Sequence, residues 1–143
     1  MTRIFAIGCD IVDVSRIARL DARFGPAFRA KFLHPSEQRR ASALPPAGVP
    51  AFLASRWAAK EALHKALRAA APPRLLFPDM EVASTPAGAP FFVLHGAAGA
   101  HAAAQRLRLS VSLSHERSAA VAFVVAEQEE EAKADGREGG KGR

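Results

Sequence analysis

The spacing of apolar residues predicts strands near both ends of the chain, with helices grouped between them. The expected strands cover residues 4–12, 80–83, 91–94, 109–113 and 119–126. The expected helices cover residues 15–24, 26–33, 36–44, 49–70 and 96–106. Because strands and helices do not alternate along the chain, we predict an α+β domain. Its antiparallel sheet should pack against the long central helix and the shorter helices.

Capping and helix-breaking residues set the expected helix boundaries. Ser15 and Ser36 are candidate N-caps, and the pairs 25–26 and 45–46, which contain Gly or Pro, end two helices. On the long helix, counting 100° per residue predicts one core face. Its members are Phe52, Ala59, Leu63, Ala66, Leu67 and Ala70.

The length and composition fit a single domain. The chain has 143 residues, and 49% of them are hydrophobic, which suffices for one core. We expect the domain to cover residues 1–126 and a charged, disordered tail to cover residues 127–143. No apolar run reaches the roughly 18–20 residues that span a bilayer, and no signal-peptide pattern precedes the domain. A cytoplasmic, unprocessed protein without a membrane partner is therefore expected.

The charge is basic and unevenly distributed. The formal net charge is +6, and the six acids and four bases of the expected tail contribute −2, which leaves +8 on the body. A basic body favours an acidic protein, a nucleotide cofactor or nucleic acid. The arginines are dispersed and the usual nucleic-acid-binding motifs are absent, so nucleic acid is disfavoured. Cys9, the only cysteine, lies in an apolar strand, where we expect a buried and unreactive thiol.

Two acidic positions have chemical implications. Asp10 interrupts a strand that should be buried, and a buried carboxylate costs several kcal/mol unless it is paired or binds a metal. Capping the following turn explains Asp10 equally well. Glu61 and Lys65 lie four residues apart, away from the core face of the long helix, which indicates an exposed salt bridge. Their neighbours favour a metal–polyphosphate ligand, with a solvated face as the alternative; these neighbours are Arg56, Trp57, Lys60 and His64.

Two further patterns are weaker. His115 lies in the turn between the last two strands, where a lone histidine is more often incidental than catalytic. Ser112 and Ser114 alternate with apolar residues, so both could face one side of the sheet and hold a phosphate. A basic stripe on the first helix fits either a solubilising surface or a docking surface for an acidic helix. It consists of Arg16, Arg19 and Arg23.

Three sequence blocks occur in a distinctive order and spacing. They are Gly8-Cys9-Asp10-Ile11, Trp57-Ala58-Ala59-Lys60-Glu61-Ala62 with Lys65-Ala66, and Ser112-Leu113-Ser114-His115. Over residues 4–126 the chain resembles the holo-acyl-carrier-protein synthases, the small trimeric class of 4′-phosphopantetheinyl transferases. The resemblance implies an enzyme of fatty-acid biosynthesis that transfers 4′-phosphopantetheine from coenzyme A to a serine of apo-acyl carrier protein.

The resemblance also implies residue roles. Asp10 and Glu61 would bind Mg²⁺, and the catalytic group would be Glu61, Lys65 and Asp10. Coenzyme A would be held by Arg56, Lys65, Gly88, Pro90 and His115. The acidic helix of the carrier protein would dock on Arg16, Arg19 and Arg23. The trimer of the family implies a homotrimer with each site at a subunit boundary.

Two positions depart from the family pattern, Ala89 where lysine is frequent and Ala119 where an aromatic residue is frequent. The first would weaken a phosphate contact, and the second would loosen the packing behind His115. The alternatives to an enzyme are a non-catalytic coenzyme A-binding scaffold and a basic nucleic-acid-binding module. The presence of Asp10, Glu61 and Lys65 together favours the enzyme.

Overall fold

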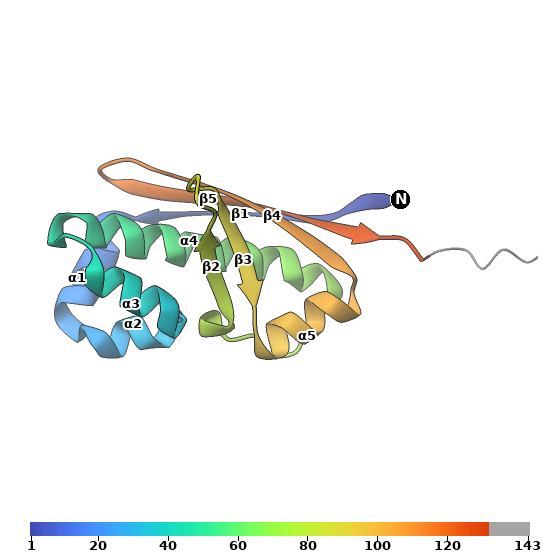
Figure 1. Cartoon of the computed structure of the whole chain (residues 1–143), viewed down its shortest axis with the longest axis horizontal. Coiled ribbons are helices and arrows are strands. Elements are labelled where there is room, and N and C mark those ends of the chain that lie inside the picture. The colour runs from blue at the N-terminus through green and yellow to red at the C-terminus, as the bar shows by residue number, and fades with distance from the viewer. Residues whose placement is uncertain (132–143) are drawn as a thin grey trace, which may run out of the picture.

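The structure, a computed structural model, describes residues 1–131 and consists of one long helix covered by a sheet, a hairpin and shorter helices (Figure 1). The strands are β1 (Thr2–Asp13), β2 (Met80–Ser84), β3 (Pro90–Leu94), β4 (Leu107–His115) and β5 (Ala119–Glu129). The α-helices are α1 (Val14–Phe24), α2 (Pro26–Phe32), α3 (Pro35–Ala43), α4 (Val49–Leu67) and α5 (Gly96–Ala104). Short 3₁₀ turns are η1 (Pro46–Gly48), η2 (Arg68–Ala70) and η3 (Phe77–Asp79). The predicted α+β class is confirmed.

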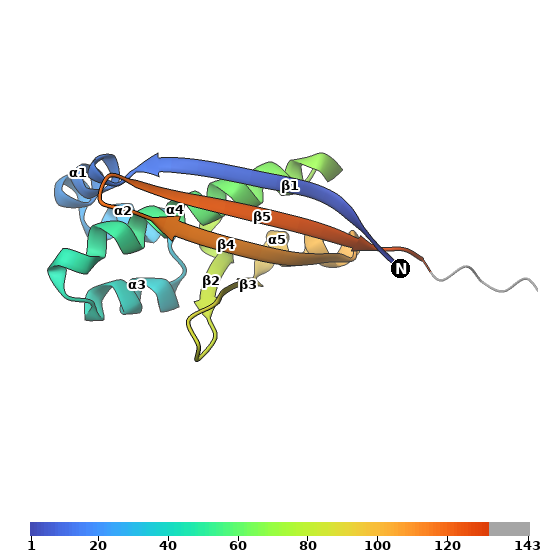
Figure 2. The same ribbon diagram turned by 90° about the horizontal axis from the view of Figure 1, so that it is seen from above.

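The larger sheet is antiparallel and has the strand order β1–β5–β4 (Figure 2). Strands β2 and β3 form a separate antiparallel hairpin. In the larger sheet Asp10 lies opposite Ala122, which in turn lies opposite Leu113. Because side chains alternate between the two faces of a sheet, Asp10 shares the helix-facing side with Gly8. Strands β1 and β4 form the two edges, with β5 between them.

Helix α4 lies at the centre of the core and packs against β1, β5, β4 and α1. The predicted core face is buried except at Ala70, which is half-buried in η2. A second face of the helix, formed by the small residues Ala54, Ala58 and Ala62, is also buried. The helix is therefore enclosed on more than one side. No helix within residues 1–131 combines the length and hydrophobicity needed to cross a bilayer.

Several predicted boundaries differ from the structure. Asp13, not Ser15, caps α1, because its extended backbone lets the carboxylate accept from the Ser15 and Arg16 amides at 2.8 and 3.4 Å. His34, not Ser36, caps α3, in a capping box with Glu37. Strand β5 continues three residues beyond the expected domain end at residue 126, paired with β1. The rest of the expected tail, from residue 132, lies outside the described residues.

Candidate active site

The position of Asp10 depends on a close approach between β1 and α4. A Cβ atom on Gly8 would lie 1.9 Å from the backbone oxygen of Ala62 and 3.2 Å from the nitrogen of Ala66. Only glycine therefore lets the strand rest directly on the helix backbone. Two residues further along the same face, Asp10 is held against α4 by this contact.

Asp10 and Lys65 meet at this point. Lys65 Nζ lies 3.0 Å from Asp10 Oδ1 and donates to the Cys9 carbonyl at 2.8 Å. Strand β1 and helix α4 run in opposite directions (Figure 2). The two residues from Gly8 to Asp10 advance about 6.6 Å along the strand, which equals the rise of about four residues back along the helix. Asp10 is therefore level with the helical turn that contains Glu61. The Asp10 side chain is 17% exposed and that of Lys65 50%, so the group is open to a ligand.

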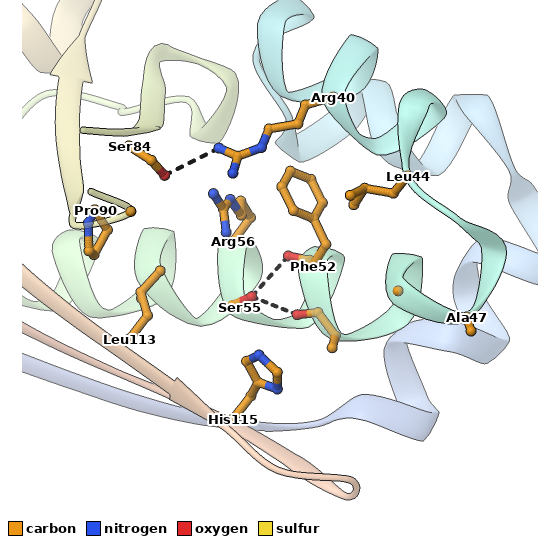
Figure 3. Close-up of a pocket in the computed structure, with 13 residues that line it drawn as sticks. Arg40, Leu44, Ala47, Phe52, Ser55, Arg56, Ser84, Pro90, Leu113 and His115 are labelled. Atoms are coloured by element: carbon orange, nitrogen blue, oxygen red, sulfur yellow. Dashed lines mark hydrogen bonds between the residues drawn. The ribbon is translucent and has the colours of Figure 1, made fainter. Parts of the chain in front are cut away.

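A cavity of about 560 Å³ is lined by four of the five residues predicted to hold coenzyme A (Figure 3). The fifth, Lys65, does not line it. It lies between α3, α4, the β2–β3 turn and the end of β4, and its lining includes Arg56, Gly88, Pro90 and His115. Gly88 has φ +90°, which closes the tight turn between Thr85 and Ala89. His115 shares the helix-facing side of the sheet with Ala120 and points towards α4.

Two arginines give this cavity a positive field. Arg56 is only 8% exposed, its Nε has no hydrogen-bond partner within the described chain, and its guanidinium lies 4.2 Å from the Phe52 ring centroid. Burial, and next the charge of Arg40, lower the pKa of Arg56 to about 10, so it stays protonated at neutral pH. Arg40 donates to Ser84 Oγ at 3.2 Å. None of the described residues that line the cavity is acidic, so the cavity is suited to an anion.

The cavity and the Asp10 group lie on opposite sides of α4. Arg56 and Lys65 are nine residues apart, which at 3.6 residues per turn separates their directions by about 180°. Asp10 belongs to the β1 edge of the sheet and His115 to the β4 edge. A single ligand that touches both groups therefore has to bridge two copies of the chain or wrap around the helix.

Not every cation near Glu61 faces this region. Lys60, which the sequence grouped with Arg56 and His64 on a ligand-facing stripe, is fully buried and forms an ion pair of 2.5 Å with Glu37. That assignment was wrong, because α4 packs against α3 and β2 on this side. Arg40, in contrast, was not singled out from the sequence. Its only sequence signal is a pair of arginines before the proline stop at residues 45–46.

The predicted docking arginines lie on the exposed surface of α1. Arg16, Arg19 and Arg23 are all exposed. Arg23 lies 4.9 Å over the ring of Phe24, which is itself 50% exposed. A small apolar cavity adjoins this ring and is lined by Leu20, Phe24, Ala27, Phe28 and Lys31. The surface thus combines positive charge with apolar area.

The outer face of the larger sheet is apolar along β1 and β5, and the described residues leave it uncovered. Ile7 and Ile11 are 72% and 70% exposed, and Phe123 is 56% exposed. Cys9 pairs with Phe123 on this face and is exposed, so the expectation of a buried thiol was wrong. Helix α4 covers only the opposite face of β1. Ser112 and Ser114 share the outer face, as their alternation predicted.

Known proteins resemble this chain over most of its length. The 4′-phosphopantetheinyl transferase superfamily matches residues 6–124. The chain is 45% identical over 125 residues to a holo-acyl-carrier-protein synthase of Nitratidesulfovibrio vulgaris, covering 87% of this chain and 98% of that protein. The crystal structure of such a synthase from Neisseria meningitidis matches with a TM-score of 0.76 and 33% identity, covering 87% and 98% of the two chains.

A second solved structure shows a ligand. It is the holo-acyl-carrier-protein synthase of Helicobacter pylori in complex with coenzyme A, which matches with a TM-score of 0.70 and 32% identity over 84% of this chain and 98% of that chain. The fold, the order of the sequence blocks and these similarities agree. This chain belongs to the 4′-phosphopantetheinyl transferase superfamily.

Proposed function

We propose that this chain is a holo-acyl-carrier-protein synthase. It transfers the 4′-phosphopantetheine group of coenzyme A to a serine of apo-acyl carrier protein and releases adenosine 3′,5′-bisphosphate. The observation that carries the proposal is the cavity that contains Arg40 and Arg56 and has no acidic residue among its described lining, which suits the phosphates of a nucleotide. The curated relatives that the chain covers almost completely have this activity in their names.

The reaction forms one bond and breaks one. The serine oxygen bonds to the β-phosphorus of coenzyme A, and the bond from that phosphorus to the bridging pyrophosphate oxygen breaks. Lys65, half-exposed beside Asp10, would stabilise the charge that develops on the pyrophosphate. Glu61, one turn earlier on the helix, is the candidate base for the serine proton. Arg40, Arg56 and His115 would hold the adenosine 3′-phosphate end.

The group around Asp10 fits a magnesium ion. Asp10 Oδ1 accepts from Lys65, and a carboxylate has about four acceptor positions, so capacity remains for a metal. Mg²⁺ is usually held by one or two carboxylates together with waters and substrate phosphates, which corresponds to Asp10, Glu61 and the pyrophosphate. When bound, the ion would neutralise charge on the pyrophosphate.

The same proposal includes a homotrimer with composite sites. The Asp10 group and the Arg40–Arg56 cavity lie on opposite sides of α4, so a second copy that brings its cavity to the β1 edge would complete the site. A head-to-tail contact of this kind closes into a ring when the rotation fits. The exposed apolar face around Ile7, Ile11 and Phe123 supports burial against other copies. Apo-acyl carrier protein would dock on Arg16, Arg19 and Arg23.

The test is direct modification of a carrier. The protein is incubated with apo-acyl carrier protein, coenzyme A and Mg²⁺, and the carrier is analysed by mass spectrometry for the added phosphopantetheine. A carrier with its acceptor serine changed to alanine is the matched control and should stay unmodified. Binding of coenzyme A without modification, under any divalent ion, would instead support a non-catalytic scaffold. Binding of nucleic acid in preference to coenzyme A would support the third alternative.

A further inference from the structure

A second group of metal-ligating side chains lies outside the site described above, where the start of α3, strand β2 and the start of α5 meet. One donor atom from each of His34, Glu81 and His95 lies within 4.8 Å of the other two. Glu81 Oε2 is 2.9 Å from His95 Nε2 and 3.5 Å from His34 Nδ1. The two imidazole rings are nearly parallel, with centroids 4.5 Å apart.

The acceptor atoms of this group lie close together. Ser36 Oγ lies 2.8 Å from both His34 Nδ1 and Glu81 Oε1, although a hydroxyl has only one proton to donate. The Ser36 amide donates to His34 Nδ1 at 3.2 Å, and an ion bound to this nitrogen would replace that contact. Two imidazoles and one carboxylate thus direct their ligand atoms into one small volume, which is the arrangement that a bound cation requires.

The spacing and chemistry of the donors narrow the choice of cation. Zinc binds histidine nitrogen and carboxylate oxygen at about 2.0–2.1 Å in a tetrahedral arrangement, so its ligands lie about 3.3 Å from one another. The donors here are at most 4.8 Å apart, and the Glu81–His95 pair is 2.9 Å apart, so each distance has to change by about 1.5 Å or less to reach this spacing. Two imidazoles and one carboxylate suit zinc and its neighbours in the first transition row, whereas Mg²⁺ prefers oxygen alone.

We propose that His34, Glu81 and His95 form a binding site for a divalent transition-metal ion of the zinc type, separate from the Asp10–Glu61 group. Their side chains are 26%, 16% and 39% exposed, so an ion can reach them from solvent. Three protein ligands leave the fourth tetrahedral position to water. The ion would link α3, which carries Arg40, to β2, which carries Ser84, and so brace one wall of the cavity.

The experiment measures zinc bound to the metal-stripped full chain by equilibrium dialysis and elemental analysis, with excess Mg²⁺ present. The test variants are His95→Gln and His34→Asn; the second keeps a side chain that caps helices well. The controls are His64→Gln, which removes a half-buried histidine outside the cluster, and Asp10→Asn. We expect about one zinc per chain in the unmodified protein and both controls. Both test variants should bind at least about 10-fold more weakly.

A measurement on the unmodified chain keeps the proposal testable if a variant does not fold. Zinc should shift the ring signals of two of the five histidines in a nuclear magnetic resonance titration and leave the other three in place. Zinc binding that survives in both test variants, that is lost only in Asp10→Asn, or that does not occur would overturn the proposal. Neither readout involves carrier modification, so the result is independent of the proposed transferase activity.

Discussion

A mixture of two inactive variants tests whether each active site is shared between two copies. Asp10→Ala removes the carboxylate on the β1 side of α4, and Arg40→Glu reverses a charge in the cavity on the other side. A charged hydrogen bond to a phosphate contributes about 1.5–3 kcal/mol, and reversal adds repulsion. Each variant alone should therefore lower kcat/KM by at least about 100-fold, which is about 2.7 kcal/mol.

The geometry determines how much activity the mixture regains. If each site joins the Asp10 side of one chain to the cavity of the next, random 1:1 mixing leaves both halves intact at about one boundary in four. The whole mixture should then reach about 25% of unmodified activity, and purified mixed trimers, in which one of three boundaries is intact, about one third. If both halves came from the same chain, every site would contain one defect and no activity would return.

The assay uses co-expressed, differently tagged variants, so that mixed oligomers are purified before carrier modification is measured by mass spectrometry. Asp10→Ala mixed with Lys65→Ala is the matched control, because both changes lie on the same side of α4 and no boundary can be restored. Native mass spectrometry establishes that the chains have mixed. Mixed oligomers of Asp10→Ala and Arg40→Glu that stay as inactive as either variant would refute the shared site.

Further outcomes follow from individual contacts. Gly8→Ala should lower the free energy of unfolding by about 3 kcal/mol or more, measured in urea, because its Cβ would lie 1.9 Å from the Ala62 oxygen; an unchanged transition midpoint would contradict the close approach. Lys60→Met should cost about 3–5 kcal/mol in the same assay, because it leaves Glu37 buried without its partner. Arg40→Gln should raise the KM for coenzyme A but not for 3′-dephospho-coenzyme A. Equal increases for both would show that Arg40 does not bind the 3′-phosphate. Arg16→Ala should raise the KM for the carrier alone, so a change confined to coenzyme A would place carrier docking elsewhere.

The architecture could be predicted because each element has its own local signal. The apolar runs, the proline stops and the period of the long helix located every strand and α-helix of the described chain, with errors of a few residues at the ends. Those errors have local causes. Asp13 and His34 each cap their helix two residues before the expected serine, since their side chains reach the free amides from an extended backbone.

Burial of charged and polar side chains was harder to predict. The helical wheel assumed one core face for α4, but the helix is enclosed by the sheet on one side and by α3 and β2 on another. Lys60 therefore lies inside, and its partner Glu37 is 23 residues away in the sequence. The same limitation concealed Arg40, whose role depends on Ser84 and Arg56 from other elements.

The residues of the Asp10 group came from the sequence, whereas their spatial relation to the cavity required the fold. Asp10 alone was as consistent with a cap as with a metal ligand. In the structure Gly8 rests on α4, and Asp10 accepts a hydrogen bond from Lys65 of the same helix. The nine-residue interval between Arg56 and Lys65 already contained the separation of about 180°. The strand order adds that Asp10 and His115 lie on opposite edges of one sheet, β1 and β4, so the two groups are separated in the fold as well.

The exposed position of Cys9 gives the chain a chemical reporter of its own assembly. It is the only thiol in the sequence, and it lies opposite Phe123 on the apolar face that a second copy would cover. Alkylation of this thiol should be fast in a dissociated chain and slow in an oligomer, because the reagent must reach the sulfur. The labelling rate against protein concentration would then give the dissociation constant without any added probe.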